Sequence, residues 1–258
     1  MNGKRTLIGL AAGIAFGLLA AGPARAELTA KANHDHITVG FFYHGSTVGV
    51  RGIADPDADL IIKIASADGH EALKEKGKKV GLWMNVGTLK FEHAPKLYEI
   101  YSTKPARELL SPEEADRYVL GYSALSRHVA VEPVESEQEK GRWFAEFLKF
   151  KEDSKLYTRS SGQITFAEKD GKREYFIITP WPYQAPPGDY VATVYAVKDG
   201  RVVETAESKV FVEQVGGVKY LASMSENHGA LYGLLSILSA LGAGFGVGLV
   251  FRKGGGAH

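Results

Sequence analysis

The stretch that decides the fold is Pro186-Pro-Gly-Asp-Tyr-Val-Ala-Thr-Val-Tyr-Ala-Val-Lys-Asp-Gly-Arg-Val-Val203. From Tyr190 to Val197 the side chains alternate with a period of two, which predicts a β-strand. Asp199-Gly200 is a two-residue hairpin turn, and residues 201–203 and 209–212 follow it as the returning strand. A Pro-Gly-Asp-Tyr entry before such a hairpin is typical of the end of an immunoglobulin-like domain, in which Tyr190 would bond to nearby backbone as a corner tyrosine.

Outside this hairpin, short strand-like segments alternate with turns rich in Gly, Asp and Pro. They are residues 37–43, 47–53, 60–65, 80–86, 96–101, 162–166 and 173–178. Strands of this length at short spacing are typical of a β-sandwich. We therefore expect a mainly β fold, an immunoglobulin-like antiparallel β-sandwich, although two separate β domains remain an alternative.

A helical insertion is expected at about 104–152. Ser111-Pro-Glu-Glu114 is a capping box with proline at the first helical position, and Ser136-Glu-Gln-Glu139 is a second one. The first box predicts one helix whose apolar stripe contains Tyr118, Tyr122, Leu125 and Val129. The second predicts a helix that buries Trp143, Phe144, Phe147 and Leu148. These two helices are expected to cover one face or edge of the sheets.

The C-terminal segment Gly229 to Phe251 contains no charged residue and ends at Arg252-Lys253. At 1.5 Å per residue a helix of roughly 23 residues is about 34 Å long, enough to cross a bilayer core of about 30 Å. We expect a transmembrane helix at 229–251. Small residues recur every four positions along it, at Ser236, Ala240, Gly244 and Gly248, which predicts a face for packing against another membrane helix.

The N-terminal segment has the pattern of a secretory signal. Lys4-Arg5 precede an apolar run from Leu7 to Ala21, and Ala24-Arg25-Ala26 supplies a cleavage site. The expected organisation is a signal peptide at 1–26, a periplasmic domain at 27–226, the membrane helix, and a cytoplasmic tail at 252–258. An uncleaved N-terminal anchor is the alternative. Arg252-Lys253 favour a cytoplasmic C-terminus, which predicts a single-pass protein of the bacterial inner membrane.

Composition excludes several classes of function. The formal net charge is +1, which argues against nucleic acid as a partner. The chain has no cysteine, so thiol catalysis, iron–sulfur clusters and disulfides are excluded.

The motifs also give no support for catalysis or phosphate binding. No Gly-x-Ser-x-Gly elbow accompanies His44 and Ser46, and the glycines between 45 and 52 precede no helix that would bind phosphate. We expect neither an enzyme nor a bound cofactor.

With those segments placed, the chain resembles a family of uncharacterised transmembrane proteins of alphaproteobacteria. The resemblance covers nearly the whole length. It depends on the 37–53 strand pair, the Gly81-Leu-Trp-Met-Asn85 block, the 95–98 segment leading into Ser102-Thr-Lys-Pro105, and the C-terminal anchor. It implies an exported, membrane-anchored protein without established activity, whose genes sometimes lie beside sulfite-exporter-type permeases. It supplies no catalytic residues.

The most suggestive local cluster is His34-Asp35-His36. On an extended backbone residues i and i+2 point the same way, so both imidazoles could bind Zn²⁺ or Cu²⁺, with His44 as a third ligand. A polar arm before the first strand is the alternative, and it is the one we favour. Asp55, Asp57 and Asp59 likewise suit a Ca²⁺ site less well than an Asp-rich turn, because the EF-hand glycine and glutamate are missing.

Two classes of function remain at this point. The favoured one is a membrane-anchored periplasmic accessory or binding module that docks on a membrane partner, such as a transporter, or on its own copy through the membrane helix. The alternative is a periplasmic protein that binds a metal or small anion through the arm of His34 and His36. The lipid bilayer is an expected partner in both.

Overall fold

The computed structural model describes residues 27–169 and 172–252. The predicted signal peptide and all but the first residue of the predicted cytoplasmic tail lie outside the described residues. The strands are β1 (Lys31–Ala32), β2 (His36–Val39), β3 (Ser46–Ala54), β4 (Asp59–Ser66), β5 (Asp68–Lys79), β6 (Leu82–Pro95), β7 (Tyr98–Ser102), β8 (Ala130–Glu132), β9 (Tyr157–Ser161), β10 (Thr165–Lys169), β11 (Lys172–Trp181), β12 (Gly188–Lys198) and β13 (Arg201–Gln214). The helices are α1 (Ala106–Leu109), α2 (Pro112–Tyr118), α3 (Tyr122–His128), α4 (Glu137–Asp153), α5 (Gly216–Asn227) and α6 (Gly229–Arg252).

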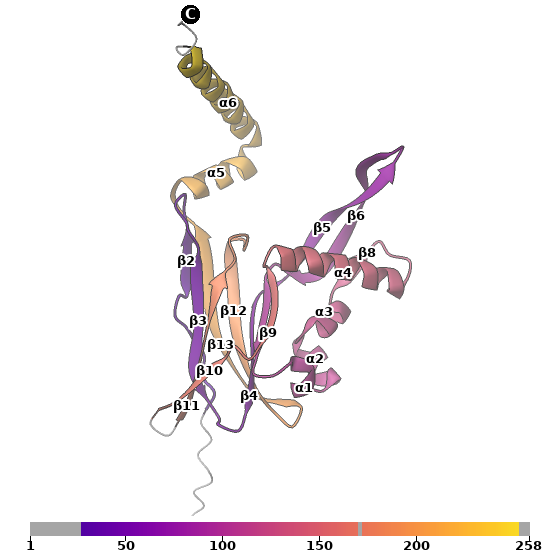
Figure 1. Ribbon diagram of the computed structural model, residues 1–258, viewed down its shortest axis with the longest axis vertical. Helices are drawn as coiled ribbons and strands as arrows, with labels where there is room; N and C mark the ends of the chain where they lie inside the picture. Colours follow the sequence, from indigo (N-terminus) through magenta and orange to yellow (C-terminus); the bar gives the residue numbers. More distant parts are fainter. Residues whose placement is uncertain (1–26, 170–171, 253–258) are drawn as a thin grey trace, which may run out of the picture.

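Two sheets form the body of the molecule (Figure 1). The four-stranded sheet has the order β1-β3-β11-β10, and the six-stranded sheet has the order β2-β13-β12-β4-β7-β9. Neighbouring strands are antiparallel except for two parallel pairs, β2 with β13 and β7 with β9. The predicted mainly β fold with antiparallel sheets and a C-terminal apolar helix is confirmed.

The two sheets contact each other through side chains that alternate along the strands. Trp181 of β11 meets Tyr190 of β12 edge-on, with ring centroids 4.9 Å apart. The hydroxyl of Tyr190 donates to the carbonyl of Pro186, as expected of a corner tyrosine. At one edge, the backbone N–H of Ala32 in β1 donates to the hydroxyl of Ser208 in β13 at 2.9 Å. One hydrophobic core therefore joins both sheets.

The helical insertion contains four helices rather than the two expected, with β8 between the third and the fourth. Both capping boxes are present: Ser111 caps α2, and Ser136 caps α4. The single helix expected to run from Ser111 past Val129 is wrong, because the backbone turns left-handed at Val119 with φ 50°. Tyr98 stabilises this break, since its hydroxyl donates to the Val119 carbonyl and accepts from the N–H of Gly121.

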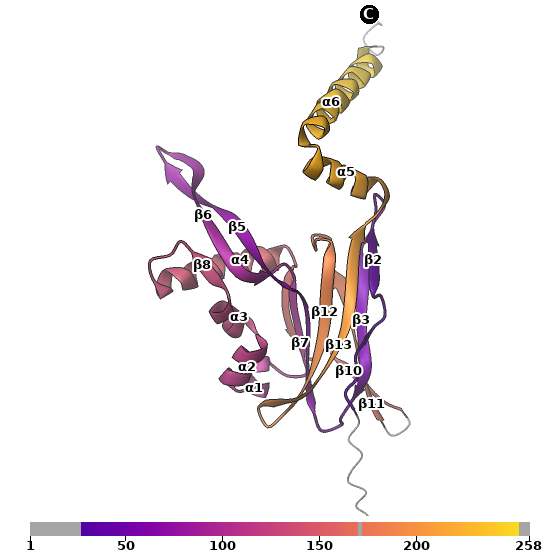
Figure 2. The same cartoon turned by 180° about the vertical axis from the view of Figure 1, so that it is seen from behind.

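A long hairpin leaves the body beside these helices, and we call residues 68–95 the arm (Figures 1 and 2). It consists of β5 and β6, which pair with each other and, through β6, with β8. The expectation that residues 80–86 form a strand of the sandwich is therefore wrong: they form the turn and outer end of a projecting hairpin. Residues 68–79, which sequence analysis left unassigned, supply its other strand.

The chain leaves the six-stranded sheet through one short helix before it enters the C-terminal apolar helix. β13 ends at Gln214, α5 follows, and α6 extends away from the body along the long axis (Figure 1). The segment Gly229–Leu249 is long and apolar enough to cross a membrane, and none of it is buried inside the protein.

Candidate functional site

A cavity of about 680 Å³ opens between the two sheets beside β7, β9 and β11. Acidic, basic, aromatic and hydroxyl side chains line it, among them Glu99, Tyr101, Lys155, Arg159, Thr179 and Trp181. The segment that begins Pro180-Trp-Pro-Tyr183 supplies much of one wall. Its two prolines restrict the backbone there, which gives the wall a fixed shape.

Glu99 is the central acidic side chain of this cavity and is only 2% exposed. Its Oε2 accepts hydrogen bonds from the hydroxyls of Tyr101 at 3.2 Å and Thr179 at 3.4 Å. Those two hydroxyls lie 2.5 Å from each other. Because Thr179 belongs to the four-stranded sheet and the other two residues to β7, this cluster ties the sheets together by polar contacts inside an apolar core.

The surroundings of Glu99 raise the pKa of its carboxyl to about 7. Burial is the main cause, because a carboxylate loses its hydration in the interior, while the hydrogen bonds from Tyr101 and Thr179 act in the opposite direction. Such a shift is typical of catalytic acids and also of buried structural groups. The bonds to two neighbouring hydroxyls favour the structural interpretation for Glu99.

The proline-flanked aromatic segment divides into a core residue and a surface residue. Trp181 is 3% exposed, and its indole nitrogen makes no hydrogen bond within the described part of the chain. Tyr183 is largely exposed, and its hydroxyl donates to the carbonyl of His44. Lys155 and Arg159 line the same cavity and supply its basic side chains.

Two of the three histidines predicted as metal ligands, His34 and His36, have other partners close by. A ring nitrogen of His34 lies 2.8 Å from the carbonyl oxygen of Thr47, and Nε2 of His36 lies 2.9 Å from the carboxylate of Glu213. Among the described residues no group of three or more His, Cys, Asp or Glu side chains is arranged to hold a metal ion. Metal binding by His34, His36 and His44 stays a prediction to which the geometry adds no support.

The aspartates of the 55–59 segment form a turn, as sequence analysis favoured. The Asp55 carboxylate accepts the backbone N–H of Asp57 at 2.9 Å and a bond from Lys198 at 2.8 Å. Asp59 pairs with Lys104 at 2.9 Å. Each of these contacts is structural, since it closes the turn or links it to a neighbouring segment.

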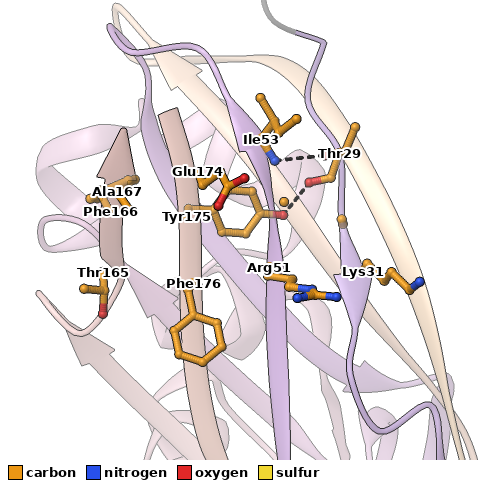
Figure 3. Close-up of a pocket in the computed structure, with 12 residues that line it drawn as sticks. Thr29, Lys31, Arg51, Ile53, Thr165, Phe166, Ala167, Glu174, Tyr175 and Phe176 are labelled. Atoms are coloured by element: carbon orange, nitrogen blue, oxygen red, sulfur yellow. Dashed lines mark hydrogen bonds between the residues drawn. The ribbon is translucent and has the colours of Figure 1, made fainter. Parts of the chain in front are cut away.

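A second hollow of about 630 Å³ lies on the four-stranded sheet, where residues of β1, β3, β10 and β11 line it (Figure 3). Figure 3 shows Thr29 bonded to both neighbouring strands: its hydroxyl accepts the N–H of Ile53 at 2.8 Å, and its carbonyl accepts the hydroxyl of Tyr175 at 2.6 Å. Gly52 permits this approach, because a Cβ there would lie 1.8 Å from the Thr29 carbonyl oxygen. Arg51 and Phe176 line the open part, which therefore offers a charged and an aromatic contact.

The predicted packing face of the membrane helix is exposed in the single chain. Ser236, Ala240, Gly244 and Gly248 all lie on α6 and are solvent-exposed. A Cβ placed on Gly244 or Gly248 would meet no neighbouring atom within 4 Å. The hydroxyl of Ser236 is satisfied within the helix by the carbonyl of Tyr232 at 2.8 Å. Nothing in the described chain covers this face.

The body and α6 together define a class: a mainly β protein that, within residues 27–169 and 172–252, has one candidate membrane-crossing helix after its last strand. The family model described as "Putative transmembrane protein (Alph_Pro_TM)" matches residues 27–253. The chain belongs to this family, as the resemblance implied. No curated protein and no solved structure matches the chain.

Proposed function

We propose that this protein is a non-enzymatic, membrane-anchored accessory or binding module that docks on a membrane partner such as a transporter. In this proposal α6 crosses the bacterial inner membrane once, the body lies in the periplasm, and the tail that begins at Arg252 lies in the cytoplasm. Membership of a transmembrane family supports the anchoring. Arg252-Lys253 after the span support the orientation.

The observation that carries the proposal is the uncovered surface of α6. A helix of this length and apolarity with none of its surface buried requires lipid or another helix around it. Its small residues recur on one side, where two backbones can approach closely in lipid. A helix that served only as a tether would gain nothing from glycines, which lower helix propensity.

Co-purification of the full chain tests this proposal. Gly244→Ile with Gly248→Ile adds bulk to the small face and should abolish detergent-stable association with a partner protein or with a second copy. At 3.6 residues per turn, Gly242 and Gly246 lie on the far side of the helix. Gly242→Ile with Gly246→Ile is therefore the matched control and should leave association intact.

The expected readout is loss of crosslinked or co-purified partner in the first double variant alone, with equal amounts of both variants in the membrane fraction. Equal association of the two variants would contradict a role for this face and would reduce α6 to a passive anchor.

The alternative function is binding of a metal or small anion by the N-terminal segment that contains His34 and His36. It gains no support from the geometry, since Glu213 already bonds to His36.

We further propose that the two sheets form an immunoglobulin-like sandwich of the variable type. In that assignment the four-stranded sheet corresponds to strands A, B, E and D, and β12, β13 and β4 correspond to F, G and C. The hydrogen bond from Tyr190 to Pro186 at the start of β12 supports it. In chain order, the arm would then be an insertion before β7 and the helices an insertion after it.

A further inference from the structure

The outer end of the arm is an exposed apolar tip, formed by Val80, Leu82, Trp83 and Met84. Val80 is fully exposed at the turn, and Trp83 is 71% exposed. Large apolar side chains that gather at the end of a projection are unusual in water, because they gain nothing from exposure and favour aggregation. The tip therefore requires a covering that the described chain does not supply.

The base of the arm is firmly packed, so its direction relative to the body is fixed. Phe91 of β6 stacks on Phe147 of α4, with ring centroids 4.3 Å apart. Lys151 of α4 is buried and pairs with Glu71 of β5. Beyond these contacts the two strands continue without a third one, and such a ribbon is only marginally stable in water.

Lysines surround the apolar tip. Residues 74–88 contain four lysines and one glutamate, which leaves a net charge of +3. Lys78 lies directly across the ribbon from Trp83, and Lys79 across from Leu82. Within the described residues, Lys76, Lys78 and Lys79 form no ion pair, so their charges are available to an anionic surface.

The tip lies on the membrane side of the molecule. The arm extends from the body toward the end from which α6 leaves, and its tip reaches about the level at which α6 begins (Figures 1 and 2). A second apolar pair, Phe41 and Phe42, is exposed in the turn between β2 and β3. A Cβ on Gly217 of α5 would lie 2.2 Å from the Phe41 ring, which places this turn against the start of the connection to α6.

We propose that the tip of the arm enters the boundary between headgroups and acyl chains of the same bilayer that α6 crosses. Trp83 lies at the interface, where an amphipathic indole is most stable, and Val80, Leu82 and Met84 enter the acyl region. Lys76, Lys78 and Lys79 lie against anionic headgroups. The body is then held at two separate points, so it cannot swing freely about the segment after β13.

A lipid surface fits this tip better than a protein does. A stable protein interface buries roughly 800 Å² on each partner, which is more than four side chains at the end of a two-stranded ribbon provide. A bilayer needs no matching shape, and it accepts tryptophan and lysine together at its surface. The inference rests on the membrane anchorage proposed above, so the experiment measures that anchorage separately.

The test uses the full chain, one copy per nanodisc, with brominated acyl chains as the quencher of tryptophan fluorescence. Trp83 is expected to be quenched, whereas Trp181 is buried in the body and Trp143 is half-buried on α4. Replacing the reporter, Trp83→Phe, should remove most of the lipid-dependent quenching. Quenching that persists unchanged in Trp83→Phe, or that is absent in the wild type, would overturn the proposal.

A second comparison uses a tip variant that keeps Trp83 as the reporter. Leu82→Asp with Met84→Asp should shift Trp83 emission to longer wavelength and abolish its quenching. Val203→Asp changes a comparably exposed apolar residue on β13 of the body and should have no effect. Lys78→Glu with Lys79→Glu should weaken quenching in discs that contain phosphatidylglycerol but not in phosphatidylcholine discs.

Co-elution of the chain with the disc reports insertion of α6 independently of the tip. A chain that co-elutes but shows no quenching overturns only the tip proposal, whereas a chain that does not co-elute overturns the anchorage and the tip proposal together. A photo-crosslinker at position 80 distinguishes the occupants. Crosslinks to lipid support the inference, and crosslinks to a second copy or another protein contradict it.

Discussion

Glu99 shows how one side chain makes the contact between two sheets depend on pH. Its carboxyl has a pKa of about 7 in the folded protein and an ordinary value of 4.5. The folded state therefore holds this proton more tightly than the unfolded state does. The stabilisation is complete below pH 4.5 and is lost as the pH rises through about 7, because the unfolded chain releases the proton first.

We expect Glu99→Gln to remove this dependence. Glutamine keeps an acceptor for Tyr101 and Thr179 but carries no charge, so the variant should gain about 3 kcal/mol relative to wild type between pH 4.5 and pH 8. Denaturant unfolding of the full chain in detergent, followed by tryptophan fluorescence, measures this. Glu146→Gln, at an exposed position of α4, is the control. A constant difference between Glu99→Gln and wild type across this range would contradict the buried-acid interpretation.

Residues 96–101 were correctly predicted as a strand, but nothing in this segment predicted that Glu99 is buried. Its partner Thr179 lies 80 positions away in the sequence. A strand pattern states which residues share a face; it does not state which other sheet covers that face. The same limit applies to Trp181, because its two flanking prolines do not indicate whether the indole lies in the core or at the surface.

At the level of helices and strands, the helical insertion shows that tertiary contacts can override the helical spacing of the sequence. Tyr118, Tyr122, Leu125 and Val129 have helical spacing, yet the helix is interrupted at Val119. Left-handed backbone is costly for a β-branched residue. The hydrogen bonds between Tyr98 and the backbone on both sides of Leu120 replace those that a continuous helix would have made.

Because Val119 has a left-handed backbone conformation, we expect glycine to be tolerated there unusually well. Val119→Gly deletes a partly buried side chain but relieves roughly 1–2 kcal/mol of left-handed strain, so its free energy of unfolding should stay within about 1 kcal/mol of wild type. Val129→Gly at an ordinary φ of −76° removes a fully buried side chain and should cost at least about 2 kcal/mol. Chemical denaturation of both variants compares them. Equal losses in the two variants would show that Val119 is not strained.

The sequence predicted only one of the two strands of the arm. Residues 80–86 were recognised as strand-like because they are apolar and β-branched or aromatic, but residues 68–79 are mostly charged and show no apolar alternation. Both faces of this ribbon contact solvent along much of its length, so neither face needs to be apolar. Periodicity detects strands that cover a core, and it does not detect a strand whose only partner is its neighbour in a hairpin.

For the whole molecule, we expect the mature chain to begin at Glu27 and to have its body outside the cytoplasm. Ala24-Arg-Ala26 predicts the cleavage, and Arg252-Lys253 predict the orientation of the span. Intact mass of the membrane-purified protein should show loss of 26 residues. Protease added to spheroplasts should degrade the body and leave the C-terminal tail protected. Retention of the first 26 residues would instead indicate a protein with two spans.

The parallel pairing of β2 with β13 sets the order of events during biosynthesis in this topology. His36 of β2 pairs with Phe211 of β13. Because β13 is the last strand of the chain, β2 can join the six-stranded sheet only after β13 is available. Only residues 215–228 separate β13 from the membrane helix. In the proposed topology, the six-stranded sheet of an exported chain would therefore stay incomplete until α6 enters the translocon, and β13 would join the sheet beside the bilayer.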